Sequence, residues 1–177
     1  MRYRMLQVLA ALALCLPNPV LAQSFIHEVR AGVLAHDVPI VGAGHYEDGV
    51  SLNAEVAFTP SLALFGGAIR PVLGGTFTTN QGTSWAYLDA RWEWAGPLFF
   101  FGIGVGPSIH TGDSLYYSYP GNKGLGSRVL FHVPLEVGLQ VTPDNRISVY
   151  YEHASNAFLA YPNPGMDNVG LRLAHRF

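Results

Sequence analysis

The sequence predicts an all-β protein, an eight-stranded antiparallel transmembrane β-barrel of the outer-membrane type. The 177 residues are 49% hydrophobic and only 12% charged, an unusual balance for a soluble domain. After residue 22, no apolar run is long enough to form a membrane-spanning helix. Eight segments of about ten residues instead alternate apolar and polar side chains, which is typical of tilted strands in a closed membrane barrel.

Residues 1–22 are typical of a secretory signal peptide. Arg2 and Arg4 give a basic start, residues 5–16 form an apolar stretch, and residues 20–22 (VLA) resemble a small-residue cleavage site. The apolar stretch is too short to cross a bilayer as a helix. Residues 23–177 are therefore expected to form a single barrel domain in the outer membrane, after export through the periplasm.

The residues that remain after cleavage exclude several function classes. Cys15, the only cysteine, belongs to the signal, which excludes disulfides, Cys-based zinc sites and a cysteine nucleophile. Loss of Arg2 and Arg4 from the ten basic residues leaves eight, against twelve acidic ones. No basic stripe is present, so nucleic acid is not expected as a partner. The seven histidines lack the HExxH spacing of a zinc hydrolase, and no metal or other cofactor is expected.

The eight expected strands are read from their alternation. In the fourth, apolar residues from Ala86 to Trp94 alternate with polar ones from Tyr87 to Glu93, and in the sixth every second residue from Val129 to Val141 is apolar. The fifth carries glycines at 102, 104 and 106, which lack the spacing of a phosphate loop and are expected to leave room inside the barrel. The strands are predicted at residues 26–36, 49–59, 68–79, 84–95, 98–109, 128–141, 145–155 and 167–177.

The polar phase of these strands carries charges of both signs. An eight-stranded barrel has an interior just wide enough to be filled with side chains. Because buried charges need partners, a buried ion-pair network is expected there rather than a pore. The residues expected in it are Glu28, Arg30, Glu55, Asp89, Arg91, Glu93, Arg128, Glu136, Arg146, Glu152 and Arg172.

The connections alternate in length. Short turns are expected at residues 95–97 and 142–144, and long loops at 37–48 and 110–127. Outer-membrane barrels keep short turns in the periplasm and long loops outside, so both termini are assigned to the periplasm. A periplasmic aromatic girdle is then expected from Phe58, Trp92, Trp94, Phe99 and Phe177.

Three reactive residue types lie on the apolar phase of the last two strands. His153 and Ser155 share a strand face, with Cα atoms about 6.5–7 Å apart, and Asp167 lies across the final hairpin. A serine hydrolase needs a hydroxyl nucleophile, a base within hydrogen-bond reach and a group that orients the base. Ser155, His153 and Asp167 could fill these roles, with Asn156 or nearby backbone amides stabilising the oxyanion. The alternative from the residues alone is that polar groups near the barrel rim only contact lipid headgroups.

The stretch YYEHASNAFLAYPNPGMDNVGLRLAHRF resembles the carboxy-terminal end of the lipid A 3-O-deacylase family (PagL type). The resemblance implies an outer-membrane barrel with a His-X-Ser-Asn element facing lipid. It assigns the base to His153, the nucleophile to Ser155 and an oxyanion-hole asparagine to Asn156. The family's acid is a glutamate fourteen residues after the histidine, and Asp167 stands at that position. This is a departure, since aspartate is one methylene shorter.

The implied reaction is hydrolysis of the ester-linked 3-hydroxyacyl chain at position 3 of lipid A, by a serine esterase mechanism without metal. The implied partner is lipopolysaccharide of the outer leaflet. Phe158, Leu159 and Tyr161 are candidates for holding acyl chains, with ordinary loop packing as the alternative. The rival functions are a structural or adhesive barrel of the OmpA or OmpX kind and, less favoured, a lipid A palmitoyltransferase. A homodimer is left open, because nothing in the sequence sets the oligomeric state.

Overall fold

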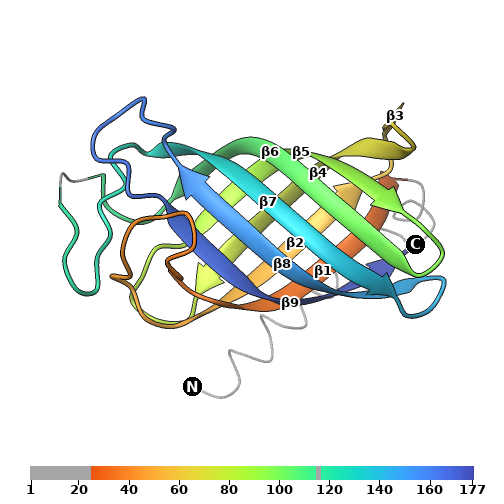
Figure 1. The fold of residues 1–177 in the computed structure, drawn as a ribbon, viewed down its shortest axis with the longest axis horizontal. Helices are drawn as coiled ribbons and strands as arrows, with labels where there is room; N and C mark the ends of the chain where they lie inside the picture. The colour runs from red at the N-terminus through yellow and green to blue at the C-terminus, as the bar shows by residue number, and fades with distance from the viewer. Residues whose placement is uncertain (1–24, 115–116) are drawn as a thin grey trace, which may run out of the picture.

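A computed structural model describes residues 25–114 and 117–177 of the chain; the expected signal peptide lies outside the described residues. Eight antiparallel strands close into a barrel, because β1 pairs with both β2 and β9 and β2 pairs with β4 (Figure 1). The strands are β1 (Ile26–Ala35), β2 (Val50–Phe58), β4 (Gly67–Thr78), β5 (Trp85–Ala95), β6 (Phe99–His110), β7 (Val129–Gln140), β8 (Asn145–Ser155) and β9 (Met166–Arg176). The predicted fold class is confirmed, and each strand begins and ends within one residue of its predicted bounds.

A ninth, short strand was not predicted. β3 (Leu62–Leu64) forms a hairpin with the first residues of β4, where Leu64 pairs with Gly67. The turn between them consists of Phe65 and Gly66, with φ of 49° and 76°, the positive values that a tight two-residue hairpin requires. β3 extends the barrel wall beyond β4 and leaves the ring of eight unchanged.

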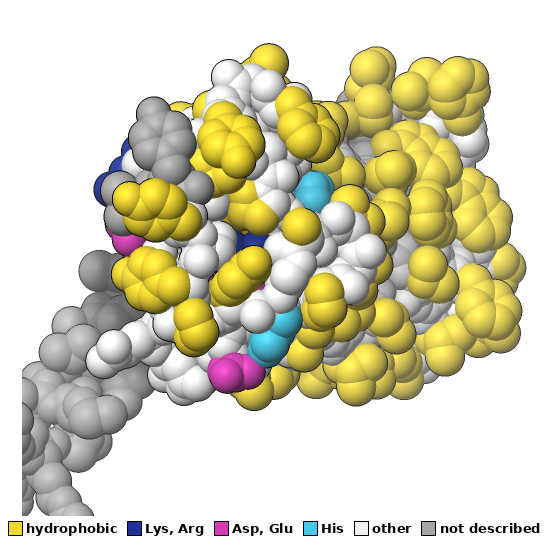
Figure 2. All heavy atoms as spheres, turned by 60° about the vertical axis from the view of Figure 1, so that its left-hand side comes forward, with side chains coloured by type: hydrophobic (Ala, Val, Ile, Leu, Met, Phe, Trp, Pro, Cys, Tyr) yellow, Lys and Arg dark blue, Asp and Glu magenta, His cyan; other side chains and the backbone are white. Residues whose placement is uncertain are grey.

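Side chains alternate between an apolar outer wall and a polar interior. Along β7, Val129, Phe131 and Val137 are exposed, whereas their neighbours His132 and Glu136 are buried. Hydrophobic side chains cover the barrel wall in Figure 2, as expected for a surface that meets lipid hydrocarbon. None of the described residues forms a helix long and apolar enough to cross a membrane.

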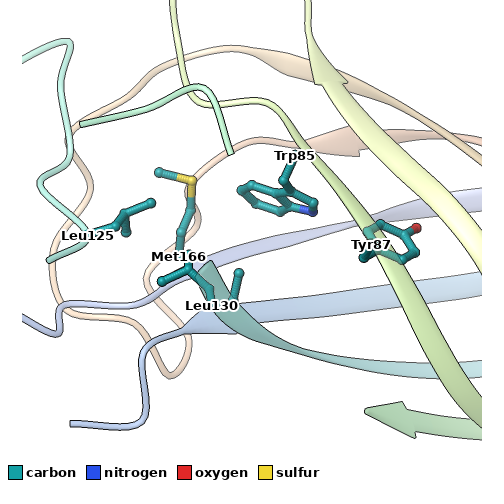
Figure 3. Close-up of a cluster of buried hydrophobic side chains, with 6 residues drawn as sticks. Trp85, Tyr87, Leu125, Leu130 and Met166 are labelled. Atoms are coloured by element: carbon teal, nitrogen blue, oxygen red, sulfur yellow. The ribbon is translucent and has the colours of Figure 1, made fainter. Parts of the chain in front are cut away.

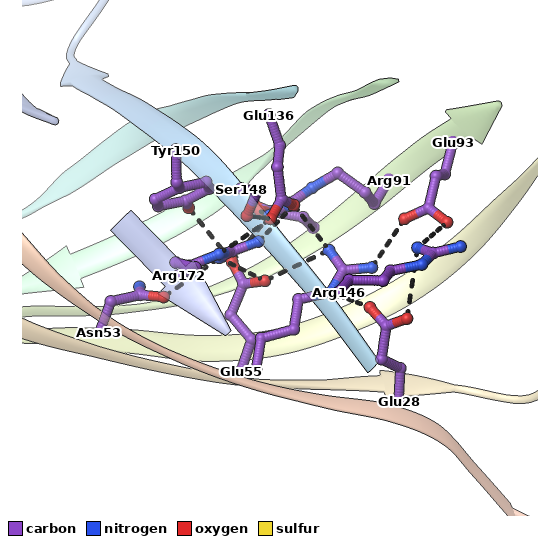
Figure 4. A network of polar contacts seen from close by, with 12 residues as sticks. Glu28, Asn53, Glu55, Arg91, Glu93, Glu136, Arg146, Ser148, Tyr150 and Arg172 are labelled. Carbon is purple, nitrogen blue, oxygen red and sulfur yellow. Dashed lines mark hydrogen bonds and ion pairs between the residues drawn. The ribbon is translucent and has the colours of Figure 1, made fainter. Parts of the chain in front are cut away.

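The interior is filled by the predicted ion-pair network (Figure 4). Glu55 lies 2.9 Å from Arg91 and 2.8 Å from Arg172, and Arg172 also lies 2.5 Å from Glu136. Room for Arg91 comes from Gly104, where a Cβ atom would lie only 2.8 Å from the Arg91 Nε. The other predicted members that take part are Glu28, Arg30, Asp89, Glu93, Arg146 and Glu152.

The prediction for Arg128 was wrong. This residue precedes the first residue of β7 and is exposed, and its Nη1 donates to the Gly112 carbonyl over 2.9 Å. Alternation fixes the facing of a side chain only inside a strand, and Arg128 lies just outside one.

The two ends of the barrel differ. The short connections lie at the end where β1 starts, and the long loops 36–49, 111–128 and 156–165 lie at the other end (Figure 1). The aromatic residues predicted for the girdle lie at the short-turn end, where the Phe25 and Phe58 rings are 5.1 Å apart and Phe99 is exposed. Their contact with lipid headgroups stays a prediction.

A small apolar cluster closes the interior at the long-loop end (Figure 3). It combines strand residues with Leu125 from loop 111–128. Two of its members, Ala154 and Met166, are direct neighbours of His153 and Asp167 in the chain but point inward. The strand segments that carry His153 and Asp167 on the outer wall are therefore packed against this cluster on their inner side. The cluster consists of Trp85, Tyr87, Leu125, Leu130, Ala154 and Met166.

Candidate active site

The ends of β8 and β9 bring the three predicted site residues together on the outer wall. His153 and Asp167 are direct Cα partners in the antiparallel register, and Ser155 follows His153 on the same face. Direct partners in a strand pair have Cβ atoms about 5 Å apart, so a histidine and an aspartate there can touch. The period-2 pattern thus places all three side chains on one patch at the long-loop end of the barrel.

A continuous hydrogen-bond chain joins these side chains. The Ser155 Oγ lies 2.9 Å from His153 Nε2, and His153 Nδ1 lies 2.5 Å from Asp167 Oδ1. An ionised carboxylate only accepts, so Nδ1 carries the proton and Nε2 is left to accept from the serine hydroxyl. The His153 side chain is 16% exposed and Asp167 is completely buried. This arrangement can remove a proton from Ser155 and hold the resulting imidazolium against a fixed anion.

The Asp167 carboxylate is solvated by neutral donors. Its Oδ2 accepts three consecutive backbone N–H groups of loop 36–49, from Ile40 over 3.1 Å, Val41 over 2.5 Å and Gly42 over 2.7 Å. Its Oδ1 accepts a hydrogen bond from the Tyr151 hydroxyl over 2.9 Å, in addition to the one from His153 Nδ1. A buried charge without such donors would be strongly unfavourable.

Close backbone approach seats loop 36–49 on the last loop, 156–165. A Cβ atom on Gly42 would lie 2.9 Å from the Gly165 carbonyl, and Ala43 donates its N–H to the Pro164 carbonyl over 2.6 Å. Gly165 itself has a φ of 63°, and a Cβ atom there would lie 2.6 Å from His153 Cε1. Glycine at this position therefore leaves the space that the His153 ring occupies.

A buried ion pair and a buried carboxylate hold loop 36–49 in place. Lys123 Nζ lies 2.5 Å from Asp37 Oδ1, with both side chains buried. Burial alone would raise the pKa of Glu47, but hydrogen bonds from His36, Thr83 and Lys123 hold that pKa below its usual value. These contacts tie loop 36–49 to loop 111–128. They thereby hold in place the N–H groups of Ile40–Gly42 that donate to Asp167.

The Asn156 side chain, predicted to bind the oxyanion, bonds to two loop carbonyls. Its side-chain amide donates to the carbonyls of Leu125, over 2.9 Å, and Pro162, over 2.8 Å. The carboxamide thus organises the last loop. The next two residues, Ala157 and Phe158, have φ of 52° and 61°, and successive N–H groups in such turns form anion-binding concavities. Oxyanion binding by Asn156 stays a prediction.

An apolar pocket of about 380 Å³ lies beside Ser155, between β6, β7 and the last loop. Phe131, which lines it, is the direct Cα partner of Ser155. Leu159 also lines the pocket, whereas Phe158 and Tyr161 do not. All three are more than three-quarters exposed, at 86% for Phe158, 80% for Leu159 and 77% for Tyr161. Such exposure argues against the loop-packing alternative for these residues.

Two parts of the site were missed in the sequence. Tyr151 shares the face of His153, and its position two residues before the histidine is the signal that could have found it. The N–H groups of Ile40–Gly42 gave no signal, because any residue except proline supplies one. No three His, Cys, Asp or Glu side chains in residues 25–114 and 117–177 are grouped so as to hold a metal ion.

The fold and the site define an outer-membrane β-barrel whose lipid-facing wall carries a hydrogen-bonded serine, histidine and aspartate. The model of a family described as "Lipid A 3-O-deacylase (PagL)" matches residues 49–176. The lipid A deacylase PagL of Bordetella bronchiseptica is 32% identical over 163 residues, which cover 84% of each chain. The chain belongs to the lipid A 3-O-deacylase (PagL) family, as the resemblance predicted.

Solved structures with this fold include an enzyme and a surface protein. The crystal structure of the outer membrane enzyme PagL matches with a TM-score of 0.62 at 22% identity, covering 85% of this chain and 99% of that one. Neisserial surface protein A matches with a TM-score of 0.53 at 10% identity, covering 87% and 97%. Together with the family, the barrel confirms the predicted location in the outer membrane.

Proposed function

We propose that the chain is a lipid A 3-O-deacylase of the serine esterase type, which hydrolyses the ester-linked 3-hydroxyacyl chain at position 3 of lipid A. Membership of the family supports the substrate and the ester bond. The observation that carries the mechanism is the unbroken chain from Ser155 through His153 to Asp167 on the lipid-facing wall. A lipid ester in the outer leaflet reaches such a site without leaving the membrane.

The first half of the reaction forms an acyl-enzyme. Ser155 Oγ attacks the ester carbonyl carbon while His153 Nε2 takes the hydroxyl proton, and Asp167 stabilises the imidazolium. The resulting oxyanion needs donors, and we assign this role to the backbone N–H groups of Ala157 and Phe158, which follow Ser155 in a turn with positive φ, together with Asn156. When the carbonyl re-forms, the C–O bond to the sugar breaks and His153 returns its proton to the leaving sugar oxygen.

The second half releases the fatty acid. A water molecule gives a proton to His153 and attacks the acyl carbonyl, after which the bond to Ser155 Oγ breaks and the serine regains its proton. The pocket of about 380 Å³ beside Phe131 and Leu159 supplies an apolar surface for the acyl chain. No step needs a metal or another cofactor. The homodimer left open by the sequence stays a prediction.

Mass spectrometry of lipid A tests this proposal. Wild type, Ser155→Ala and a control, Ser114→Ala in loop 111–128, are folded in detergent and incubated with lipopolysaccharide. Wild type and Ser114→Ala are expected to remove one 3-hydroxyacyl chain, and Ser155→Ala none. Loss of the chain with Ser155→Ala as well would overturn the assignment of the nucleophile. No loss with folded wild type, across several lipid A types, would favour the non-enzymatic barrel.

A further inference from the structure

Tyr151 donates a hydrogen bond to the Asp167 carboxylate from the neighbouring strand β8. It lies two residues before His153 on β8, on the same outward face, and pairs with Val169 of β9. Asp167 is therefore its diagonal neighbour across the strand pair, about 7–8 Å away between backbones, which a long side chain can bridge. The phenol spans this gap and donates to Asp167 Oδ1 over 2.9 Å, the same oxygen that accepts from His153.

We propose that Tyr151 is a positioning residue of the hydrolytic site, whose hydroxyl fixes the rotation of the Asp167 carboxylate so that Oδ1 faces His153 Nδ1. The inference rests on the function proposed above. The terminal torsion of an aspartate is broad, so hydrogen bonds rather than rotamer preference set the plane of its carboxylate. Loop 36–49 holds Oδ2 from one side, and Tyr151 holds Oδ1 from the other.

The surroundings of Tyr151 favour this role over that of a membrane anchor. Below it on the same face of β8 are Val149 and Ile147, both exposed on the apolar wall. Tyr151 is thus the last polar side chain before the hydrocarbon-facing surface. An interfacial tyrosine turns its hydroxyl to the lipid headgroups. The hydroxyl of Tyr151 is turned instead to a completely buried carboxylate, which would otherwise face hydrocarbon with one donor fewer.

Labelling with a fluorophosphonate measures the activation of Ser155 without the natural substrate. Ser155 Oγ attacks the phosphorus, fluoride leaves with the bonding electrons, and His153 takes the hydroxyl proton. The labelling rate is compared for wild type, Tyr151→Phe, Asp167→Asn and the double variant, each checked for folding by its heat-dependent gel mobility. Tyr119→Phe, an exposed tyrosine of loop 111–128, is the matched control.

Tyr151→Phe is expected to slow labelling about tenfold to hundredfold, the range for losing a hydrogen bond to a charged group. Tyr119→Phe is expected to label at the wild-type rate. In the Asp167→Asn background, Tyr151→Phe is expected to cost no more than about twofold further, because the two residues act through one carboxylate. With lipopolysaccharide as substrate, kcat is expected to fall at unchanged KM, since Tyr151 acts through Asp167.

The outcomes separate this inference from the proposed function. Labelling of Tyr151→Phe at the wild-type rate, or a full additional loss in the Asp167→Asn background, would overturn the positioning role. Labelled wild type that removes no acyl chain from lipopolysaccharide would overturn the substrate, while the Tyr151 comparison would still be decided by labelling. Folded wild type that does not label Ser155 would overturn both.

Discussion

His132 and His153 lie on opposite faces of the same barrel wall, and each contacts a carboxylate. They are close in the fold, because His132 is the direct Cα partner of Ala154, the residue after His153. His132 faces the interior, with Asp89 3.0 Å from Nδ1 and Glu152 3.1 Å from Nε2, and is completely buried. His153 faces outward, with a carboxylate on Nδ1 but a hydroxyl on Nε2.

The two histidines differ in the partner of Nε2, which is a carboxylate for His132 and a serine hydroxyl for His153. Ionised carboxylates only accept, so neither nitrogen of His132 is left to accept a proton when both of its partners are ionised. His153 has one nitrogen free to accept a proton, and its neighbour on that side is a potential nucleophile. The anions differ as well: Asp89 beside His132 is also bound by Arg91, whereas Asp167 is bound by backbone N–H groups, a phenol and the imidazole. Because no arginine or lysine among the described residues is bound to Asp167, its charge is available to stabilise the imidazolium that forms on His153 during the reaction.

Replacing each histidine by alanine gives the largest contrast. His153→Ala is expected to lower lipid A hydrolysis about 10⁴-fold or more, because the base is lost, with little change in stability. His132→Ala is expected to lower the free energy of unfolding by about 3–5 kcal/mol, because two buried carboxylates lose their partner. Hydrolysis rates and denaturant unfolding measure the two effects. An equal loss of activity in folded His132→Ala would break the comparison.

Changing the anion sharpens the comparison. Asp167→Asn is expected to slow hydrolysis about 10³-fold to 10⁴-fold, because the amide no longer stabilises the imidazolium or fixes its tautomer. Asp167→Glu, which places here the acid that the sequence resemblance implies, is expected to stay within about tenfold of wild type, since a longer carboxylate can still reach Nδ1. Rates with lipopolysaccharide measure both. Full activity of Asp167→Asn would show that His153 works without its anion.

Displacing the imidazole tests whether geometry alone separates the two histidines. Gly165→Ala adds a Cβ atom that would lie 2.6 Å from His153 Cε1, at a φ of 63°. Activity is expected to fall about 100-fold, the effect of a misplacement of roughly 1 Å. Gly121→Ala is the matched control, because its φ is 85° but nothing lies within 4 Å of the added atom. Equal losses of activity in the two variants would point to backbone strain rather than to the ring position.

Releasing loop 36–49 should have the smallest effect on the chemistry. Lys123→Met leaves Asp37 buried without its cation, and is expected to lower the free energy of unfolding by about 3 kcal/mol. Activity is expected to fall about tenfold in the folded fraction, because the loop supplies three of the donors to Asp167. Arg128→Met, which removes an exposed arginine, is expected to unfold like wild type. Unchanged stability of Lys123→Met would refute the role of the ion pair.

The alternation of apolar and polar residues predicted the strands and the side of the barrel wall on which each of their side chains lies. Each barrel strand was placed within one residue, because in a strand with one lipid-facing side the period of two leaves a single register. The same pattern predicted the interior network and placed His153, Ser155 and Asp167 on one outer patch. It failed for Arg128, just outside β7, and for β3, which is three residues long and apolar throughout.

Contacts made by the loops could not be predicted from the sequence. The N–H groups of Ile40, Val41 and Gly42 bind a carboxylate that lies 125 to 127 positions away in the chain. Backbone donors leave no residue pattern, so only the fold reveals them. The Asn156 side chain makes further contacts of this kind, because its amide donates to the carbonyls of Leu125 and Pro162 in two loops.

Because main-chain groups hold the Asp167 carboxylate, the side chains of loop 36–49 at positions 40 and 41 are not needed for that contact. At positions 40 and 41 every amino acid except proline carries the N–H that the carboxylate needs. Ile40 and Val41 expose their side chains, so these can be exchanged without touching that bond. Substitutions at positions 40 and 41, other than proline, therefore leave the donors to Asp167 in place.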